Sequence, residues 1–330
     1  MLNNKSILIT GGTGTFGSAF LEYCLKNFKN IKRIVVFSRD ELKQYNLSKK
    51  FSPTEFPNLR YFIGDIRDFQ RLKRALEGID YVIHAAALKQ VSTAEYNPAE
   101  TIKTNVLGTQ NLIEASLDSN VKKVVALSTD KAVSPVNLYG ATKLCAEKLM
   151  VSANNMRGKR DISFSVLRYG NVFGSRGSVF PEFQRQKKSG NLEITDKRMT
   201  RFNIELKESI KLALYVLKNS LGGEIFVPKL PSFNIIDLAK VIDPKCKLRF
   251  VGIRQGEKLH EEMITESESL NCLESKNLYL LLPTIKNQLA KKYLKSEKWK
   301  MNKKNFSYSS NLNSNFMNIK KLKLLVSKYK

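Results

Sequence analysis

Short apolar runs alternate with segments of helical spacing along the first half of the chain. The first run, 5–10, is rich in β-forming residues and leads through glycines into a helical pattern at Ala19, Phe20 and Tyr23. Later runs of the same character are each predicted to form a buried strand: 33–37, 59–63, 81–84, 122–127 and 163–167. Strands that alternate with helices indicate an α/β fold with a doubly wound parallel sheet of the Rossmann type.

Glycines follow the first predicted strand directly. Gly11, Gly14 and Gly17 are spaced G-x-x-G-x-x-G, and Gly12 together with the last two also satisfies G-x-G-x-x-G. Glycines at such a place permit a tight turn, close approach of a pyrophosphate to the backbone, and packing of a helix on a strand. An ordinary turn is the alternative, but the order strand, turn, helix favours dinucleotide binding.

The end of the second predicted strand bears on the choice of cofactor. Ser38 and Arg39 stand where an NAD-binding site would carry an acidic residue for the ribose hydroxyls. A hydroxyl and a guanidinium suit a 2′-phosphate, and Lys43 adds a second cation, although Asp40 argues mildly the other way. The alternative is that Arg39 is a solvated loop residue. We expect NADP rather than NAD.

The chain divides into two parts on this basis. Residues 1–167 are predicted to form an NADP-binding Rossmann domain, and 168–330 mainly a smaller C-terminal substrate-binding lobe with a basic tail. The segment 202–220 has helical apolar spacing and is expected to pack back on the first domain. We also expect Asp65, after the predicted strand 59–63, to contact the adenine amino group of the cofactor. His84, at the end of the predicted strand 81–84, is expected to be a packed core histidine.

Protonic side chains follow the predicted strand 122–127. Ser128-Thr129-Asp130-Lys131 lies at the carboxyl edge of the sheet, where ligands bind in open α/β sheets. Tyr139 and Lys143 stand four residues apart in a helical segment and so share one face. The lysine is expected to lower the tyrosine pKa from about 10, making it a base near neutrality. Taken alone, this spacing is more typical of two surface residues, and its place in the fold favours an active site.

Composition narrows the classes of protein. No apolar stretch approaches the roughly 20 residues of a membrane span, and no signal peptide is evident before the glycine loop. The four cysteines form no C-x-x-C pair or ligand cluster, so we expect no metal and a reducing, cytoplasmic location.

The net charge of +26 ordinarily suggests a polyanion partner. The lysines, however, are scattered among Glu and Asn without a nucleic-acid motif, and compositional drift explains their abundance better. We expect no nucleic-acid or membrane partner, and part of the charge to attract an anionic substrate.

The chain resembles the extended short-chain dehydrogenase/reductase family from about Ser6 to about Tyr308. More narrowly, it is similar to the inverting UDP-N-acetylglucosamine 4,6-dehydratases, which begin pseudaminic acid synthesis. The motifs that carry this resemblance are 129–131 (TDK), 137–143 (NLYGATK), 168–171 (RYGN), 176–178 (RGS), 199–202 (MTRF) and 256–261 (GEKLHE). Dehydratases that retain the C5 configuration usually carry Thr-Asp-Glu, so Lys131 is the distinguishing residue.

The resemblance implies a redox-neutral dehydration of UDP-N-acetylglucosamine to UDP-2-acetamido-2,6-dideoxy-beta-L-arabino-hex-4-ulose. Tyr139 would remove the C4 hydroxyl proton as hydride passes to the nicotinamide, with Lys143 holding the cofactor ribose. Lys131 would abstract the C5 proton, and Asp130 would protonate the departing C6 hydroxyl before hydride returns to C6. Lys131 must then be neutral and Asp130 protonated. We expect burial and nearby cations to lower the pKa of Lys131, and an apolar or anionic surrounding to raise that of Asp130.

The resemblance also implies the site residues and a homo-oligomer. The expected catalytic residues are Thr129, Asp130, Lys131, Tyr139 and Lys143. The expected cofactor-binding residues are Gly11, Thr13, Gly14, Thr15, Phe16, Gly17, Ser38, Arg39, Asp40, Glu41, Leu42, Lys43, Asp65, Ile66, Ala85, Lys89, Asn105, Tyr139, Lys143 and Val172. The expected substrate-binding residues are Lys89, Asn171, Arg176, Gly177, Ser178, Val179, Phe180, Thr195, Met199, Arg254 and Glu257; Arg201 is a further cation that could reach the diphosphate.

Other functional classes remain open. A nucleotide-sugar 4-epimerase or a C5-retaining 4,6-dehydratase would share the fold, the cofactor, Tyr139 and Lys143. A noncatalytic NADP-binding sensor or a basic binding protein is a third class, which the intact Thr129, Tyr139 and Lys143 disfavour. Lys131 in place of Glu favours the inverting dehydratase over the second class.

Overall fold

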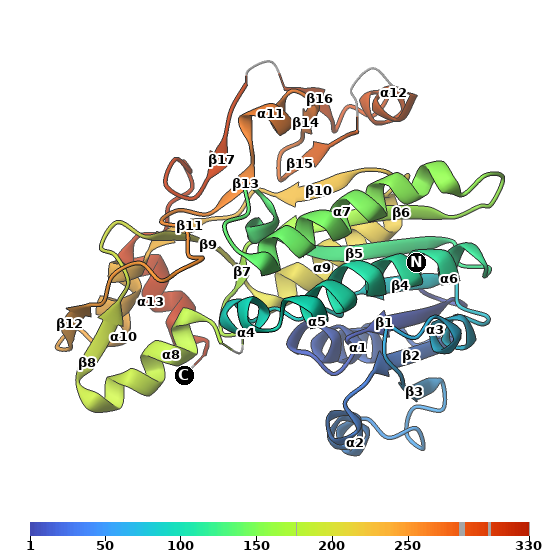
Figure 1. Cartoon of the computed structure of the whole chain (residues 1–330), viewed down its shortest axis with the longest axis horizontal. Helices are drawn as coiled ribbons and strands as arrows, with labels where there is room; N and C mark the ends of the chain where they lie inside the picture. The colour runs from blue at the N-terminus through green and yellow to red at the C-terminus, as the bar shows by residue number, and fades with distance from the viewer. Residues whose placement is uncertain (176, 284–287, 303–304, 330) are drawn as a thin grey trace.

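A large sheet runs through the centre of the molecule (Figure 1). The structure is a computed structural model that describes residues 1–175, 177–283, 288–302 and 305–329. Within these residues, a 10-stranded sheet has the order β16-β14-β15-β10-β6-β5-β4-β1-β2-β3. Its parallel strands are β1 (Ser6–Thr10), β2 (Arg33–Ser38), β3 (Leu59–Ile63), β4 (Tyr81–His84), β5 (Lys123–Thr129), β6 (Ser163–Tyr169) and β10 (Ile225–Pro228). Antiparallel strands β14 (Cys272–Glu274), β15 (Leu278–Leu281) and β16 (Lys300–Met301) complete it.

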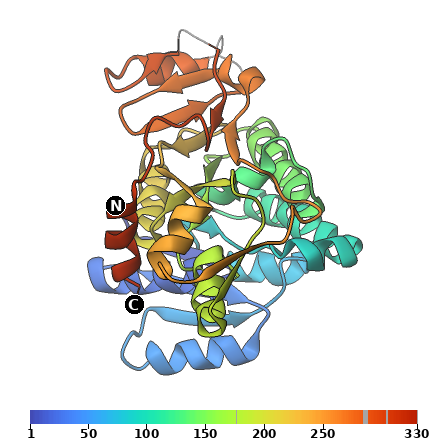
Figure 2. The ribbon, with the colours of Figure 1, turned by 90° about the vertical axis from the view of Figure 1, so that its left-hand side faces the viewer.

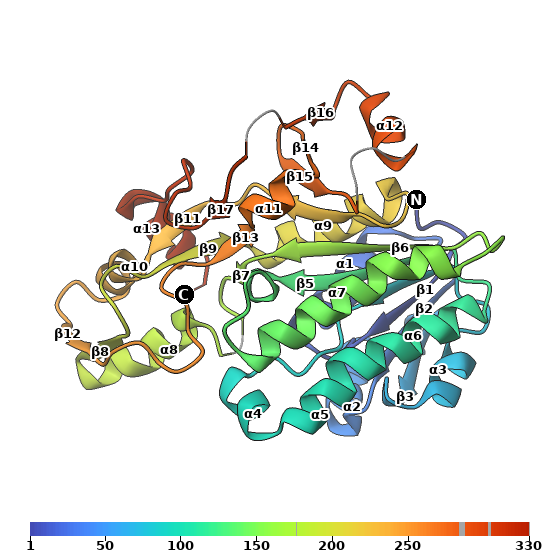
Figure 3. The ribbon, with the colours of Figure 1, turned by 45° about the horizontal axis from the view of Figure 1, so that its top comes forward.

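Helices cover both faces of this sheet, as a doubly wound fold requires (Figures 1 and 3). On one face α1 (Thr15–Asn27) packs against α9 (Leu206–Asn219); on the other α6 (Gly108–Leu117) lies between α3 (Phe69–Ala75) and α7 (Leu138–Met156). Shorter helices are α2 (Glu41–Lys50), α4 (Val91–Tyr96) and α5 (Pro98–Ile102), followed by a π-helical turn, 103–107. Across the described ranges, every helix is too short or too polar to traverse a bilayer.

The central strands are apolar throughout because helices shield them from both sides. All five residues of β1 and all seven of β6 are buried. Such strands lack the alternation of half-buried strands, which is why the sequence shows them as continuous apolar runs. This core fixes the carboxyl edge of β1, β4, β5 and β6 as a common platform for the loops that follow.

A smaller lobe with its own apolar cluster stands beyond the carboxyl edge (Figure 2). Its helices α8 (Val179–Gln186), α10 (Ile235–Ile242) and α13 (Ile319–Ser327) contribute to that cluster. Helices α11 (Glu266–Ser269) and α12 (Gln288–Leu294) lie instead by β14, β15 and β16 of the main sheet, and α12 packs into the main core (Figure 1). Small sheets pair β8 (Asn191–Ile194) with β12 (Lys247–Phe250), β9 (Thr200–Ile204) with β7 (Asn171–Val172) and β11 (Ser232–Asn234), and β13 (Glu262–Ile264) with β17 (Tyr308–Ser309). The tail helix α13 packs on α10.

The structure confirms the predicted fold class and corrects one element. All six predicted strands are present, and α7 extends beyond Tyr139 and Lys143 as expected. Residues 202–204, however, belong to strand β9, and the helix begins only at Leu206. Glu205 and Glu208 form a capping box that sets this start. The helix packs on α1, β5 and β6, as predicted.

The second half of the chain is not confined to the smaller lobe. It supplies β10, β14, β15 and β16 to the main sheet. The division into 1–167 and 168–330 therefore remains a prediction of domain organisation, and the sheet itself continues across it.

A buried ion cluster ties the C-terminal half to α7. Arg168 at the end of β6 donates to both carboxylate oxygens of Glu147 on α7, at 2.9 and 2.6 Å, and to Glu268 on α11 at 3.0 and 2.9 Å. The Arg168 and Glu147 side chains are each 1% exposed. Because a buried charge is stable only when it is paired, this cluster fixes α7 against β6.

We expect Arg168→Met to lower the free energy of unfolding by about 3–5 kcal/mol, because it leaves the Glu147 carboxylate buried without its partner. Denaturant unfolding measures this. The matched control is Arg185→Met, which removes an arginine whose side chain is 73% exposed beside Glu182 and should change stability little. Equal small losses in the two variants would contradict the assigned role of the buried cluster.

Candidate active site

The glycine loop leaves the start of α1 open toward the sheet edge. Gly14 is the N-cap of α1, and no side chain caps this helix or places an acid in its first turn. Gly11 has φ +64°, and a Cβ there would lie 2.8 Å from the Ala86 nitrogen; at Gly17 it would lie 2.5 Å from the Gly11 oxygen. The loop is thus closed against its own backbone, while the helix amides remain suited to an anion, so these residues fit a dinucleotide pyrophosphate.

Cations gather at the ends of β2 and β3. The Arg39 guanidinium lies 3.6 Å from the Asp65 carboxylate, and the Lys43 ammonium lies 2.6 Å from Asp40. Asp40 also caps α2 by accepting from the Lys43 N–H. Burial raises the pKa of Asp65, but hydrogen bonds from Arg67 outweigh this and hold it below its usual value. Asp40 therefore has a structural role as a cap, and the exposed Arg39 remains suited to a phosphate.

Lys131 is the centre of a cluster of polar side chains that contains the predicted catalytic residue Asp130. The turn η2 (Asp130–Ala132) follows β5 directly. The Lys131 Nζ lies 3.1 Å from Asp130 Oδ1 and 3.3 Å from Glu261 Oε1, and it donates to Asn171 Oδ1 at 3.0 Å. Strand β5, β7 and the loop before β13 thus bring together side chains that are up to 131 positions apart in the sequence.

Gly140 allows α7 to approach this turn. A Cβ on Gly140 would collide with the Lys131 carbonyl oxygen. The Asn137 side chain caps α7 by accepting from the Gly140 N–H at 2.8 Å. The motif 137–143 therefore has a geometric reason: its cap starts the helix, and its glycine brings Tyr139 beside Lys131.

The pKa of Tyr139 and the hydrogen bonding of Lys143 differ from the sequence prediction. Burial raises the pKa of Tyr139 to about 12, and the opposing cation is Lys131 rather than Lys143. Lys143 donates to the Leu127 carbonyl at 2.8 Å, and burial lowers its own pKa to about 8. The prediction that Lys143 makes the phenol acidic is wrong for this structure, because both groups are desolvated and the ammonium is engaged by backbone.

The pKa of Lys131 also shifts in the direction opposite to the prediction, whereas the pKa of Asp130 shifts in the predicted direction. Burial lowers the pKa of Lys131, but the Asp130 and Glu261 carboxylates outweigh this and hold it above its ordinary value. The prediction of a lowered pKa is therefore wrong here. Burial, and next the Glu261 carboxylate, raise the pKa of Asp130, as a general acid requires.

A cavity of about 810 Å³ opens in front of these groups, a size typical of ligand sites. Most of the predicted substrate residues line it together with Thr129, Lys131 and Tyr139: Lys89, Asn171, Gly177, Ser178, Val179, Thr195, Met199, Arg254 and Glu257. Asp130 and Lys143 are buried behind its wall. Arg176 lies outside the described residues.

Phe180 is not among the residues that line the cavity. It is buried against Phe173 and Tyr329 in the core of the smaller lobe. The prediction that it contacts substrate is not supported by this placement, since an aromatic ring on α8 can serve the lobe core instead.

Asn105 and His84 are buried and bonded within the protein. The Asn105 amide accepts from the Leu88 N–H at 2.8 Å and donates to the Leu88 carbonyl and the Thr142 hydroxyl at 2.9 and 3.0 Å. Its predicted contact with cofactor stays a prediction. The His84 ring lies within hydrogen-bond distance of the Thr10 and Thr109 hydroxyls, and burial lowers its pKa to about 3, as expected of a packed core histidine.

Sequence reasoning missed Glu261 and misplaced Arg201. Arg201 donates to the carbonyls of Thr200, Leu259 and Lys258, and its Nε lies 3.6 Å from Glu261. It therefore supports Glu261 instead of standing free for a diphosphate. The signal for Glu261 was available, because the motif 256–261 ends on a carboxylate. In the described part of the chain, His, Cys, Asp and Glu form no group of three suited to a metal ion.

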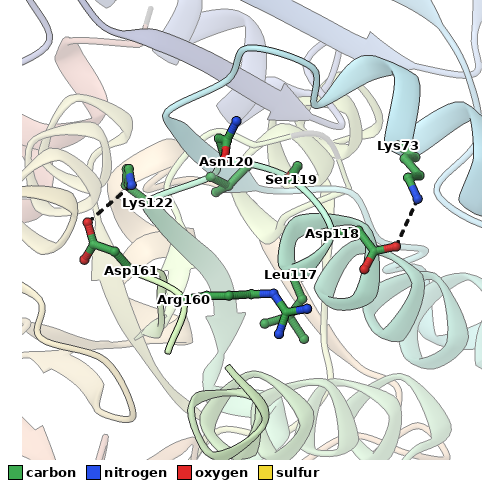
Figure 4. Close-up of a pocket in the computed structure, with 9 residues that line it drawn as sticks. Lys73, Leu117, Asp118, Ser119, Asn120, Lys122, Arg160 and Asp161 are labelled. Carbon is green, nitrogen blue, oxygen red and sulfur yellow. Dashed lines mark hydrogen bonds and ion pairs between the residues drawn. The ribbon is translucent and has the colours of Figure 1, made fainter. Parts of the chain in front are cut away.

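A second hollow, of about 550 Å³, lies at the opposite edge of the sheet (Figure 4). It is lined by residues that precede β5 and β6, where Lys73 pairs with Asp118 at 3.1 Å and Lys122 with Asp161 at 3.3 Å. None of the predicted catalytic residues lines it. The candidate active site is therefore the cavity at the carboxyl edge.

Comparison with known proteins agrees with this geometry. Residues 7–283 match the family described as polysaccharide biosynthesis protein. A UDP-N-acetylglucosamine 4,6-dehydratase (inverting) from Campylobacter jejuni subsp. jejuni serotype O:2 is 50% identical over 320 residues, which cover 95% of this chain and 94% of that protein. A UDP-glucose 4-epimerase from Rickettsia canadensis is 44% identical, with 90% and 89% covered.

Solved structures share the fold over most of the chain. Pen from Bacillus thuringiensis superposes with a TM-score of 0.90 at 38% identity, covering 100% of this chain and 99% of that chain. The dTDP-glucose 4,6-dehydratase DesIV from Streptomyces venezuelae, solved with NAD bound, gives a TM-score of 0.68 at 25% identity, covering 77% and 86%. The second comparison places a nicotinamide dinucleotide in a neighbour of this fold.

We expect Gly17→Ala to weaken binding of a nicotinamide dinucleotide by at least about tenfold, equivalent to about 1.4 kcal/mol. The added Cβ would displace the loop, because it meets the backbone of Gly11 and Gly12. Fluorescence titration with the reduced dinucleotide measures this. Lys26→Ala, at the far end of the same helix, should bind as the unchanged protein does; equal affinities for all three would contradict the assigned loop.

Proposed function

The chain belongs to the polysaccharide biosynthesis protein family, of the extended short-chain dehydrogenase/reductase type, and we propose that it catalyses the C5-inverting 4,6-dehydration of UDP-N-acetylglucosamine. The observation that carries the proposal is the Asp130–Lys131 pair, which meets Tyr139 at the wall of the cavity. An acid and a base side by side suit removal of water from adjacent carbons. The product is UDP-2-acetamido-2,6-dideoxy-beta-L-arabino-hex-4-ulose.

The glycine loop, Arg39 and Lys143 hold the nicotinamide dinucleotide in this proposal. When bound, it takes up hydride from C4 and returns it to C6, and its oxidised ring adds a positive charge that lowers the pKa of nearby phenols and ammonium groups. Tyr139 takes the C4 hydroxyl proton. The resulting C4 ketone makes the C5 hydrogen acidic.

Lys131 and Asp130 divide the loss of water between them. The neutral amine of Lys131 takes the C5 proton, and the carboxyl of Asp130 gives its proton to the departing C6 hydroxyl. Two protons leave the sugar, one to Tyr139 and one to Lys131, and two are returned, one to the hydroxyl and one to C5. A proton from solvent returns to C5 from the opposite face, which gives the inverted configuration, and Tyr139 releases the proton it took from the C4 hydroxyl to solvent.

A 4-epimerase is the second candidate, because the Rickettsia canadensis relative bears that name. Epimerisation at C4 needs hydride transfer and one proton acceptor but no base at C5 and no acid at C6. The buried Asp130, whose pKa is raised, and the adjoining Lys131 have no task in such a reaction. This favours dehydration.

We infer that NADP(H) is bound in preference to NAD(H). Ser38 ends β2 and Arg39 follows it, with a side chain that is 52% exposed. Its forked guanidinium suits a 2′-phosphate better than a ribose diol. A homo-oligomer and use of the product for pseudaminic acid remain predictions from the resemblance, and a cytoplasmic location remains a prediction from the cysteine pattern.

We expect Lys131→Ala to lower the dehydration rate by at least about 10²-fold, because it removes the base. NADP(H) affinity should be retained, since Lys131 faces the sugar in this proposal. Product formation from UDP-N-acetylglucosamine is measured together with cofactor binding. The matched control is the exposed Lys188→Ala, and turnover of the Lys131 variant at the control rate would remove Lys131 from the mechanism.

We expect Arg39→Ala to weaken NADPH binding by about tenfold or more while NADH binding changes little, because only NADPH carries the 2′-phosphate. Parallel titrations with both cofactors measure this. Arg74→Ala, which removes an arginine that is 80% exposed on α3, serves as the control. Equal losses for both cofactors, or tighter NADH binding by the unchanged protein, would reject the preference.

A further inference from the structure

Lys131 lies between two carboxylates, of which only Asp130 has a task in the proposed reaction. The second is Glu261, whose Oε1 is 3.3 Å from Lys131 Nζ and whose side chain is 3% exposed. Its backbone N–H donates to the Ser310 hydroxyl at 2.9 Å, and its carbonyl accepts from the Ser310 N–H at 2.7 Å. Ser310 therefore holds the backbone of Glu261 at both its N–H and its carbonyl.

Charged groups from three elements face Glu261 in the described structure. Lys131 and Asp130 come from η2, Arg201 comes from β9, and Lys258 comes from the loop that carries Glu261 itself. Arg201 is fixed by backbone carbonyls and lies 3.6 Å from the carboxylate. Burial raises the pKa of Glu261, but these three cations outweigh it and hold it below its ordinary value. Glu261 is thus an anion at neutral pH.

In the cluster around Lys131, two buried carboxylate oxygens accept no hydrogen bond from the described residues: Oδ2 of Asp130 and Oε2 of Glu261. An unpartnered carboxylate oxygen is costly to bury, so a second anion beside Asp130 favours its protonated form. The same anion favours the ammonium form of Lys131. Because it acts on both members of the pair in one direction, Glu261 raises the affinity of both for protons.

We propose that Glu261 is a positioning residue that, through its fixed carboxylate, sets the pH range in which the Asp130–Lys131 pair dehydrates the sugar. The inference rests on the proposed function. In the step it supports, the lone pair of Lys131 Nζ forms a bond to the C5 proton, the C5–H electrons form the C5–C6 double bond, and the C6–O bond breaks. The hydroxyl takes the Asp130 proton and leaves as water.

Glu261 stabilises the positive charge that develops on Lys131 Nζ in this step. Lys131 becomes an ammonium next to a carboxylate that is already in place, which is the arrangement that lowers a barrier without reorganisation. A proton then passes from Lys131 Nζ to Asp130 Oδ1 across 3.1 Å, which restores the amine and the carboxylic acid. Glu261 neither gains nor loses a proton in this step.

The sign of the expected effect follows from the charge. Glu261→Gln removes the anion, so both Lys131 and Asp130 bind protons less tightly. Both limbs of the pH–rate profile, which report the coupled titration of the Asp130–Lys131 pair, should move to lower pH by about one unit or more. KM for UDP-N-acetylglucosamine should change little, because the change is in proton affinity.

The test is the pH dependence of kcat and KM for the full chain and three variants. Glu261→Asp retracts the carboxylate and should displace the profile in the same direction by less. Ser310→Ala removes the hydroxyl that holds the Glu261 backbone without changing charge, and its profile should keep its position whatever its height. A Glu261→Gln profile that is lower but superimposes in pH would overturn the inference.

A second measurement keeps the inference testable without turnover. The rate at which an amine reagent labels Lys131, followed by mass spectrometry against pH, reports the pKa of its amine. The pKa of the Lys131 amine should fall in Glu261→Gln and, by less, in Glu261→Asp. Labelling curves that do not shift in pH relative to the unchanged protein would overturn the inference. If Glu261→Gln does not fold, the Glu261→Asp curve decides. If the unchanged protein forms no dehydrated sugar, the proposed function fails and not this inference. The labelling result does not depend on turnover, so the two failures can be told apart.

Discussion

The ammonium of Lys131, held between the buried carboxylates of Asp130 and Glu261, is the interaction on which the site depends. Asp130 and Lys131 lie in the turn that follows β5, and Glu261 lies directly before β13 in the C-terminal half of the chain. Buried charges of this kind are stable only when they are paired, so the two parts must close on each other for the site to form. The buried Arg168 cluster fastens the same two parts a short way along α7.

This arrangement explains why the protonation states of Lys131 and Tyr139 without cofactor and substrate differ from those that the proposed reaction requires. The Asp130 and Glu261 carboxylates favour the ammonium form of Lys131 against the effect of burial, and burial favours the phenol form of Tyr139. Asp130 alone is already disposed toward its catalytic form. Binding of an oxidised cofactor adds positive charge, which moves the pKa of both Lys131 and Tyr139 downward. The site therefore becomes a set of acids and bases only when it is loaded.

The sequence predicted the main sheet well because burial on both faces leaves long apolar runs, and it predicted the catalytic turn because Lys131 directly follows a strand. It failed where a distant residue decides the outcome. Asp130 and Glu261 together reverse the effect of burial on the pKa of Lys131, and nothing local to position 131 reveals the second carboxylate, 130 positions away. The resemblance implied that Phe180 contacts substrate, but its ring packs against Phe173 and Tyr329 in the core of the smaller lobe. At 202–204, pairing with β11 and β7 overrides helical spacing.

The central claim is that this arrangement removes water across C5 and C6 and rebuilds C5 from the opposite face. Incubation with UDP-N-acetylglucosamine in heavy water, followed by NMR of the product, tests it most directly. The account predicts a 4-keto-6-deoxy sugar with deuterium at C5 and the L-configuration. A galacto-configured product that retains its C6 hydroxyl and the C5 hydrogen would contradict it.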